Sequence, residues 1–474
     1  MHLLENIKVY ILIVFIINTT MSFIRKIKVG QKTYLAEVKS VRENGKVRQK
    51  FIRYLGTEID GKLSKRVFTK DIVVKDVKRS LDVLCIDSIA KELGIASIKN
   101  KYFLALVYSQ LLEKRSISKL GDWLRFTEIP EVLKIRDVST KELYESLTEI
   151  GDEEFERIDL EMHGIFTKYD DSIDVAVIDV TDAYFEGDSE KIQRRKGKDG
   201  KVKKLLQVGL AVSFKNGFPL FHKRYQGNLS NIQIYKDMTL ELKERGMNSV
   251  IIDRGMMSPE NLRMTLDLQL KVIAGLKKTP TIASEYLSKI SRDEIYSLKN
   301  MVKLKNTEVF INTFDYSDGK LIAVYNPSLE VMKKQLNFNR DTDVTDPFIG
   351  YSLIYHNTED LSSEIVKKYY DKEIVERAFK QIKGILNLRP IRVWLKDHVE
   401  AHIKICYLAY AILSFMNYRL RKLNISSVDV LNSLRHGYKV NLKSIKDGIE
   451  WSLYVPLEPK QKKMLQALNV VYKN

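Results

Sequence analysis

The sequence has little cysteine and no long apolar run, and these absences exclude several classes of protein. Cys85 and Cys406 are the only cysteines in 474 residues, too few for a disulfide framework or a zinc ribbon. We therefore expect a reducing, cytoplasmic setting. Two apolar stretches, residues 9–17 and Tyr407–Phe415, are far shorter than the roughly 20 residues that span a bilayer. We expect the second to be a buried helix packed on a sheet, and no membrane partner.

The first twenty residues have the pattern of an over-extended start. Only one lysine precedes the apolar stretch, and no small-residue cleavage site follows it, so the signal-peptide pattern is incomplete. Met21 comes next and opens a basic pattern typical of a strand. We expect the working protein to begin at Met21; a signal or membrane anchor is the alternative.

Acidic residues are outnumbered by basic ones. Lys and Arg total 79 and Asp and Glu total 61, which gives a net charge of +18 and a pI near 9.4. This surplus favours a polyanionic partner, because cationic side chains that neutralise phosphates release condensed counterions. It predicts nucleic acid, although lysine-rich thermophilic proteins and ribosome-associated proteins share the bias.

The order of patterns along the chain predicts several units. Asn44-Gly45 separates two alternating runs and predicts a basic β-hairpin arm over 21–60, either a solvated edge or a DNA-contacting arm. Residues 61–160 are expected to form a helical DNA-binding region with a stop at Gly121 and a break at Pro130. An α/β domain is expected over 165–279 and 350–420, a β-rich insertion over 280–349, and a C-terminal region over 421–474.

The α/β domain is predicted to contain a mixed sheet with flanking helices. Ser258, followed by Pro259, is expected to cap the N-terminus of a helix. Strands are expected at 174–180, 206–214, 218–226, 249–253 and 271–276, and helices at about 231–245, 362–384 and 399–420.

Two aspartates in this domain are candidate metal ligands. Asp179 lies inside the apolar run VAVIDV, where burial of an ionised carboxylate costs on the order of several kcal/mol unless it is paired or bound to metal. Asp253 ends the run SVIID, at the carboxyl end of a strand, where ligand sites of α/β sheets form. Acids on neighbouring strands would offer hard oxygen ligands to a divalent cation. The alternative is that Asp179 caps a turn or pairs with an arginine.

A third acid is expected from a helix. Tyr369, Lys372, Glu376 and Lys383 are spaced 3, 4 and 7 residues apart, which places them within roughly 60° on one face of a continuous helix. Glu376 borders the apolar stripe of that helix, whereas Glu373 points further out, so this geometry selects Glu376. The alternative is an ordinary amphipathic, solvated helix.

Together these segments resemble the DDE transposases of prokaryotic insertion sequences, in the group whose third-acid helix carries a Tyr-x2-Arg-x3-Glu-x6-Lys signature. The motifs IDVTDAYFEG, VIIDRGMMSPENL and Tyr369-x2-Lys372-x3-Glu376-x6-Lys383 occur in the family's order, and the resemblance covers about residues 21–420. Lys372 replaces the family's arginine, so its contact with DNA would be a point charge rather than a bidentate fork.

The resemblance implies a ribonuclease-H-like core that catalyses cleavage and strand transfer by two-metal phosphoryl transfer. Asp179, Asp253 and Glu376 would be catalytic and hold two Mg²⁺ ions, with Mn²⁺ able to substitute, while Tyr369, Lys372 and Lys383 would grip DNA phosphates. The implied partners are double-stranded terminal inverted repeats and target DNA. A homodimer in the DNA complex and a cytoplasmic, nucleoid-associated location are also expected.

Two further features bear on DNA contact. The segment 191–204 carries eight basic residues in fourteen, among them Arg194, Arg195 and Lys196, and is either a solvated loop or a DNA-backbone contact. Relatives hold an extruded base with a tryptophan of the insertion, but no tryptophan lies within 280–349 here. Phe310, Phe314, Tyr316 or Tyr325 could stack instead, and the sequence does not choose among them.

Other interpretations stay open at this point. His398 and His402 are four residues apart, but HVEAH is not a zinc-protease motif and we expect structural histidines. The function could instead be that of an inactive DNA-binding relic of a transposase, a ribonuclease-H-like nuclease or Holliday-junction resolvase, or a basic RNA- or ribosome-associated protein.

Overall fold

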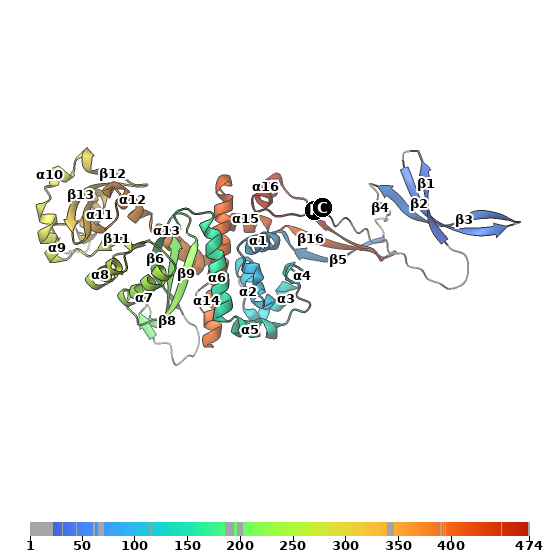
Figure 1. The fold of residues 1–474 in the computed structure, drawn as a ribbon, viewed down its shortest axis with the longest axis horizontal. Coiled ribbons are helices and arrows are strands. Elements are labelled where there is room, and N and C mark those ends of the chain that lie inside the picture. The colour runs from blue at the N-terminus through green and yellow to red at the C-terminus, as the bar shows by residue number, and fades with distance from the viewer. Residues whose placement is uncertain are drawn as a thin grey trace, which may run out of the picture. The chain divides into compact units, whose positions relative to one another are not determined.

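In the computed structural model the chain forms two compact units. The first comprises residues 1–76 and 441–452, and the second comprises residues 77–440 and 453–474. Figure 1 labels their helices and strands and colours them by position along the chain. The structure describes residues 22–30, 32–43, 45–59, 62–64, 71–113, 115–184, 194–196, 202–338, 346–388, 391, 393, 395–446 and 448–472.

The first unit contains a four-stranded antiparallel sheet in which the strands follow chain order. The two predicted strands are present and turn at Gly45, whose φ is +79°. The strand pattern expected after Met21 is β1, and with a short fourth strand that was not predicted it makes a sheet of what was expected to be a hairpin. An isolated hairpin is only marginally stable, and the added pairing extends along most of the second strand. The strands are β1 (Ser22–Val29), β2 (Lys32–Glu43), β3 (Lys46–Ile59) and β4 (Lys62–Ser64).

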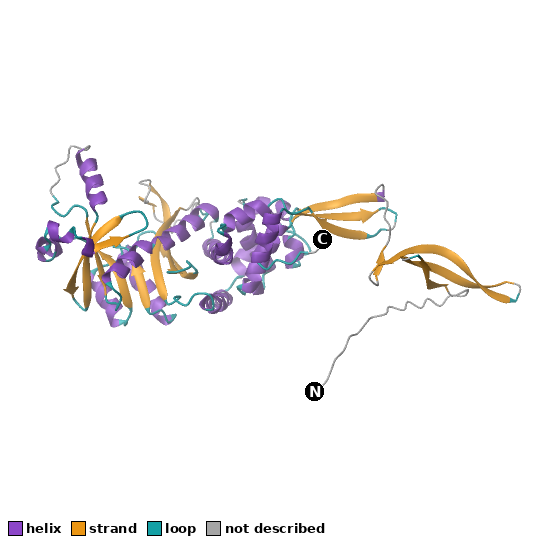
Figure 2. Cartoon of the chain, turned by 90° about the horizontal axis from the view of Figure 1, so that it is seen from above, coloured by secondary structure: helices purple, strands orange, loops and turns teal. Residues whose placement is uncertain are grey.

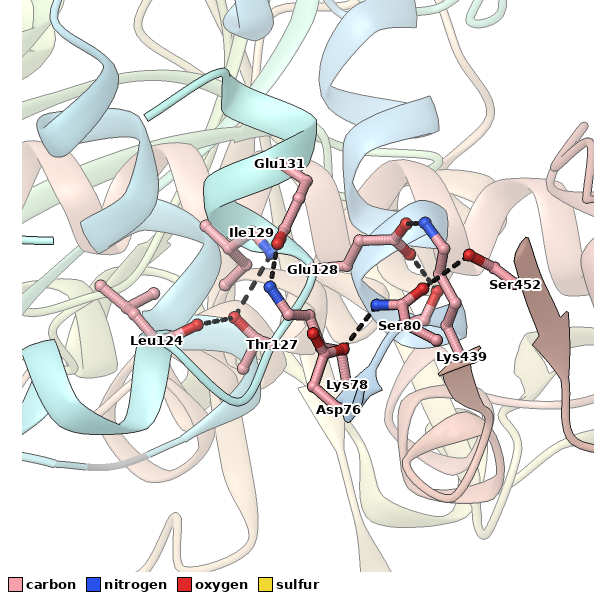
Figure 3. A network of polar contacts seen from close by, with 11 residues as sticks. Asp76, Lys78, Ser80, Leu124, Thr127, Glu128, Ile129, Glu131, Lys439 and Ser452 are labelled. Atoms are coloured by element: carbon pink, nitrogen blue, oxygen red, sulfur yellow. Dashed lines mark hydrogen bonds and ion pairs between the residues drawn. The ribbon is translucent and has the colours of Figure 1, made fainter. Parts of the chain in front are cut away.

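A second, three-stranded sheet brings together strands far apart in the sequence. Its order is β17-β16-β5, with β5 at Ile72–Arg79, β16 at Tyr438–Ser444 and β17 at Glu450–Tyr454. Because β5 is a strand, helix begins later than the predicted 61–160 region. Near the end of β5, Ser80 Oγ donates a hydrogen bond to Glu128, and Lys439 of β16 pairs with the same carboxylate (Figure 3).

Six helices fill residues 81–167, as the spacing of apolar residues predicted. The predicted stop at Gly121 is wrong. Gly121 lies inside α3, because it packs against the α5 segment so closely that a Cβ would meet Thr140 Oγ1 at 3.0 Å. Pro130 begins a helix rather than breaking one, since a missing N–H costs nothing in the first turn. The helices are α1 (Leu81–Glu92), α2 (Lys101–Leu112), α3 (Ile117–Leu124), α4 (Ile129–Leu133), α5 (Thr140–Glu149) and α6 (Asp152–Thr167).

A ten-stranded mixed sheet forms the centre of the second unit, and helices flank its strands (Figure 2). The order is β12-β13-β14-β15-β11-β10-β6-β8-β7, and β9 also pairs with β8. The five predicted strands are present as β6 (Val175–Tyr184), β8 (Val202–Ser213), β9 (Pro219–Gln226), β10 (Ser249–Ile252) and β11 (Lys271–Leu276). The others are β7 (Arg194–Lys196), β12 (Met301–Lys303), β13 (Glu308–Tyr316), β14 (Gly319–Tyr325) and β15 (Tyr351–His356).

The segment 280–349, expected to be mainly β, is mixed. Its three strands continue the central sheet, because β14 pairs with β15 and β15 with β11. Helical segments precede and follow these strands. They are α9 (Pro280–Glu285), η3 (Leu287–Lys289), α10 (Arg292–Ile295), η4 (Leu298–Asn300) and α11 (Pro327–Phe338).

Three helices of the α/β domain, α7, α8 and α12, begin where the sequence predicted. The Ser258 side chain accepts a hydrogen bond from Asn261 N and caps α8, as expected. The chain continues after β15 with four helical segments, and the C-terminal region adds three more. The helical segments of the α/β domain and the C-terminal region, including the two that precede β15, are α7 (Asn231–Glu244), α8 (Pro259–Asp267), α12 (Ser362–Asp371), α13 (Glu373–Lys380), the π-helix η5 (Gln381–Ile385), α14 (Lys396–Leu420), η6 (Arg421–Leu423), α15 (Ser427–Leu434) and α16 (Pro459–Ala467).

The long helix α14 belongs to the core. It packs against α2, α5 and β9, and Tyr407 Oη donates a 2.7 Å hydrogen bond to Asp159 of α6. Within the described residues, one helical segment, Lys396–Leu423, is long and apolar enough to cross a membrane by length and composition, and 89% of its most apolar window is buried inside the structure. The buried helix predicted from Tyr407–Phe415 is therefore confirmed.

Candidate active site

Two aspartates lie at matching levels of neighbouring parallel strands in the middle of the central sheet, Asp179 within β6 and Asp253 directly after β10. Strands β6 and β10 run parallel with Ile178 opposite Ile252. Asp179 and Asp253 are the next residues on each strand, so both acids are at adjacent positions on the same edge of the sheet. Parallel pairing produces this match because the apolar runs VAVI and SVII end at the same level. The sequence predicted the strand end at Asp253, whereas β6 continues beyond its predicted end at 180 as far as Tyr184.

Glu376 faces the same pocket as Asp179. It lies on α13, which packs against β6 and β8. The pocket has a volume of about 430 Å³ and is open to solvent; its lining residues are Asp179, Glu376, Phe379, Lys380, Lys383 and Gly384. Glu373 is not among them, so the structure distinguishes the two glutamates in the way that helix geometry suggested.

Asp253 is engaged with a cation and a hydroxyl. Lys372 Nζ lies 3.2 Å from Asp253 Oδ1, and Tyr369 Oη donates a 3.3 Å hydrogen bond to the same oxygen. Burial alone would raise the pKa of the Asp253 carboxyl, but the charge and hydrogen bond of Lys372 hold it below its usual range. Burial, together with the charge of Asp253, raises the pKa of Tyr369, so its hydroxyl stays protonated and acts as a donor.

Gly275 of β11 makes room for this contact. A Cβ at this position would lie 2.2 Å from Tyr369 Oη and 3.1 Å from Arg254 Cβ. A side chain here would therefore displace the tyrosine from Asp253. The glycine belongs to the AGLKK segment that ends the predicted strand, but only the packing of α12 on β11 explains why it is needed.

The signature residues are not on one continuous helix, and the prediction of a single helix over 362–384 is wrong. Tyr369 is on α12, which ends at Asp371, and Glu376 is on α13, which begins at Glu373. Lys383 lies in the π-helix Gln381–Ile385. The break at Lys372 directs this lysine and Tyr369 towards Asp253, while Glu376 and Lys383 line the pocket of Asp179.

Lys380 is a pocket residue that the sequence analysis missed. It follows Glu376 by four residues, one helical turn, and this spacing could have indicated it. Lys383 Nζ lies 5.1 Å from the centroid of the Phe379 ring, so the aromatic ring supports one of the two cations. Two lysines therefore border the pocket that holds two of the candidate acids.

The basic segment after Asp179 is only partly described. Arg194, Arg195 and Lys196 form β7, which pairs antiparallel with Lys204, Lys203 and Val202 of β8. Arg194 is exposed. The backbone of these three residues is thus a strand, not a loop, and their contact with DNA stays a prediction; residues 191–193 and 197–201 of that basic run lie outside the described residues.

The donors present suit a hard divalent cation, although the side chains are not gathered around one point. Carboxylate oxygens are the ligands that Mg²⁺ prefers. Asp179 and Glu376 share a pocket, whereas Asp253, their neighbour by strand position, pairs with Lys372. Within the described part of the chain, no group of three or more His, Cys, Asp or Glu side chains is arranged to hold a metal ion.

The two histidines of α14 have structural surroundings, as expected. His402 is buried, which lowers its pKa, and its Nε2 lies 3.8 Å from Cys406 Sγ. His398 stacks on Tyr144 with ring centroids 6.4 Å apart. Neither residue lies in the pocket of Asp179.

A mixed α/β sheet with acids at matching levels of two central parallel strands defines the class of protein, and sequence comparison defines the family. The model of the transposase DDE domain family matches residues 170–412, just over half of the chain. The chain belongs to this family of DDE transposases. No curated protein matches it significantly. A cryo-EM structure of a piggyBac transposase synaptic complex with hairpin DNA is similar over 79% of this chain and 82% of that chain, at 11% identity and a TM-score of 0.43.

Proposed function

We propose that this chain is a DNA transposase of a prokaryotic insertion sequence that cuts and rejoins DNA at the ends of its element. The observation that carries the proposal is the placement of Asp179 and Asp253 at matching levels of two adjacent parallel strands, with Glu376 on the pocket of Asp179. All three residues lie within the segment that matches the DDE family.

We propose a ribonuclease-H-like core for this domain. Strands β9, β8, β6, β10 and β11 are adjacent in this order. Strand β8 is antiparallel to both β9 and β6, and β6, β10 and β11 are parallel. Asp179, on the central strand β6, would then lie between the other two acids.

In the proposed mechanism the carboxylates of Asp179, Asp253 and Glu376 would hold the metal ions. Mg²⁺ ions, when bound, would supply activation of the attacking oxygen and stabilisation of the leaving oxygen. Lys380 and Lys383 supply positive charge at the pocket rim, which attracts the phosphate backbone. Tyr369 and Lys372 would turn from Asp253 to phosphate oxygens, the former as a neutral donor and the latter as a point charge.

The proposed partners are the terminal inverted repeats of the element and target DNA. The net charge of +18 supports a polyanionic partner of this kind. We also propose that the protein acts as a homodimer on DNA, in the cytoplasm at the nucleoid, with Arg194, Arg195 and Lys196 contacting the DNA backbone.

The decisive experiment is a nicking assay on duplex DNA that carries the element's ends, in Mg²⁺ and then in Mn²⁺. Asp179→Asn should abolish nicking and leave DNA binding intact. Asp182→Asn is a matched control, because it lies three residues further along β6 and therefore on the opposite face of the sheet. Undiminished cleavage by the Asp179→Asn protein would refute the assignment.

An inactive DNA-binding relic is the second candidate, and one observation favours it. Asp253 is paired with Lys372, and the described residues contain no three-membered acidic group arranged for a metal. A relic would bind the ends of the element without nicking them in either metal. A nuclease or resolvase would instead cut branched DNA in preference to those ends, so a four-way junction belongs among the substrates.

A further inference from the structure

The sheet of the first unit has two chemically different faces. Directly paired residues of neighbouring strands share a face, so Phe23, Val38 and Phe51 form one row across β1, β2 and β3. Arg25, Ala36 and Tyr54 form the next row on this face, and Ile27, Tyr34 and Thr57 the one after it. One face of the sheet therefore carries all four aromatic side chains of its described residues, Phe23, Tyr34, Phe51 and Tyr54. This face is called here the aromatic face.

The opposite face carries most of the positive charge. The described residues between 22 and 59 include ten Lys or Arg and three Glu, an excess of seven positive charges. Lys39 pairs directly with Lys50, and Arg53 with Glu37, on the face away from the aromatic rings. This second face is called here the lysine face. It carries seven of the ten basic residues: Lys26, Lys28, Lys39, Lys46, Arg48, Lys50 and Arg53.

The aromatic face is exposed in the described part of the first unit. Phe23, Phe51 and Tyr54 are 40%, 59% and 45% exposed, whereas the smaller Ala36 and Val38 between them are 1% and 4% exposed. Among the described residues of β1–β4, Ala36 and Val38 are the apolar side chains that are buried. Exposed apolar groups gathered on one surface usually mark a binding site.

Local contacts fix the orientation of the rings. Tyr54 Oη and Thr57 Oγ1 are 2.7 Å apart and hydrogen-bonded, and the rings of Tyr34 and Tyr54 lie 5.9 Å apart at 54°. Arg25 donates a 2.7 Å hydrogen bond to Gln49 on the same face. The face is thus a set of rings on a strand scaffold with a cation among them.

We propose that the aromatic face binds single-stranded DNA by stacking unpaired bases on Phe23, Phe51 and Tyr54. Aromatic side chains bind single strands with little sequence preference, because every base presents a flat π-face. Those faces are available only when the bases are unpaired, so this surface selects a single strand over a duplex.

Charge determines the choice of occupant. A second copy of the chain docked on this face would bring together two sheets that each carry an excess of seven positive charges. A nucleic acid instead neutralises that charge, and the lysine face can contact the phosphates of the adjoining duplex. The inference rests on the proposal that DNA is the partner, but not on Asp179, Asp253 or Glu376.

The experiment measures binding of fluorescein-labelled oligo(dT) of about 20 nucleotides and of a duplex of equal length to the full chain in EDTA. Phe51→Ala and Tyr54→Ala should each lower single-strand affinity at least about fivefold, the loss expected for one stacked base, with duplex affinity nearly unchanged. Lys39→Gln with Lys50→Gln is the matched control on the lysine face. It should weaken binding to both DNAs and reduce the salt dependence of binding.

Phe51→Trp keeps a stacking ring and adds a fluorescent probe, so it tests the proposal even if an alanine variant fails to fold. It should retain single-strand affinity, and oligo(dT) should quench its added tryptophan emission. Absence of quenching, or equal loss of single-strand and duplex affinity in the alanine variants, would overturn the proposal. A third outcome would also overturn the proposal. If the alanine variants keep their single-strand affinity but no longer sediment as a dimer, the aromatic face is an interface between two copies of the chain.

This result is separable from the proposed function. If the wild-type chain nicks its element's ends in Mg²⁺ but does not prefer oligo(dT) through these rings, only the present inference fails. If single-strand binding depends on the rings and no nicking occurs, the inference stands and the catalytic proposal fails.

Discussion

Lys372 Nζ and Asp253 Oδ1 are 3.2 Å apart, so a basic residue expected to grip DNA neutralises an acid expected to hold metal. The lysine side chain is 17% exposed and the aspartate 55% exposed, and Tyr369 donates to the same oxygen. Under the proposed mechanism, metal binding and DNA binding at this corner would be linked, because Asp253 would become free to coordinate a metal ion when Lys372 contacts a phosphate.

Removal of this lysine should strengthen metal binding by the DNA-free protein. In Lys372→Gln, Asp253 loses its competing cation, and we expect Mn²⁺ affinity measured by calorimetry to rise several-fold, since metal and ammonium compete for one carboxylate. The control is Lys305→Gln, which removes a lysine paired with Asp371 outside the acidic pocket. Equal affinities in wild type and Lys372→Gln would show that the pair does not compete with metal.

The same pair predicts a pH dependence of stability. The pKa of Asp253 in the folded state lies below its usual value, so the pair stabilises the fold above the unfolded-state pKa near 3.9, and this stability is lost as pH falls through the folded pKa. In Lys372→Gln, burial becomes the dominant influence and should raise the pKa of Asp253. Denaturant titrations between pH 7 and pH 3, compared for the two proteins, should show the difference shrinking towards the acid end; a constant difference would contradict it.

Glu376 and Glu373 provide a matched comparison within one helix turn. Glu376→Gln should abolish nicking, because this residue lines the pocket with Asp179, whereas Glu373→Gln should leave most activity. Both residues are exposed, so neither change should alter thermal stability appreciably. Loss of nicking in Glu373→Gln alone would transfer the role of third acid to Glu373.

The buried ion pair between Arg245 and Asp159, outside the pocket of Asp179, should contribute strongly to the free energy of unfolding. Arg245 Nη1 donates to Asp159 Oδ2 at 2.6 Å, and Tyr407 Oη donates to Oδ1 of the same carboxylate. Asp159 is 3% exposed, and burial already raises its pKa. Arg245→Met leaves that carboxylate without its cation and should cost about 3–5 kcal/mol of unfolding free energy, measured by urea denaturation.

The exposed pair Lys215–Asp171 supplies the control for that measurement. Its side chains are 54% and 86% exposed, so Lys215→Gln should change stability little. The double variant Arg245→Met with Asp159→Leu should recover much of the loss, because it removes the orphaned charge. No recovery would indicate that packing around Arg245, rather than charge, stabilises this region.

The sequence by itself determined five strands of the central sheet and the candidate acids. The runs around Asp179 and Asp253 are apolar, short and bounded, and such runs specify buried strands whatever surrounds them. The N-cap at Ser258 and the buried helix at Tyr407–Phe415 are local or compositional properties of the same kind.

Tertiary packing decided the rest. The break at Lys372 and the π-helix at Lys383 depend on how α12 and α13 meet the sheet, and periodicity alone favoured one continuous helix. Gly121 stays within a helix because of a neighbour 19 residues away in sequence, Thr140, and Gly275 is required because Tyr369 crosses it. The pairing of Lys372 with Asp253 joins residues 119 positions apart, and no local spacing encodes such a contact.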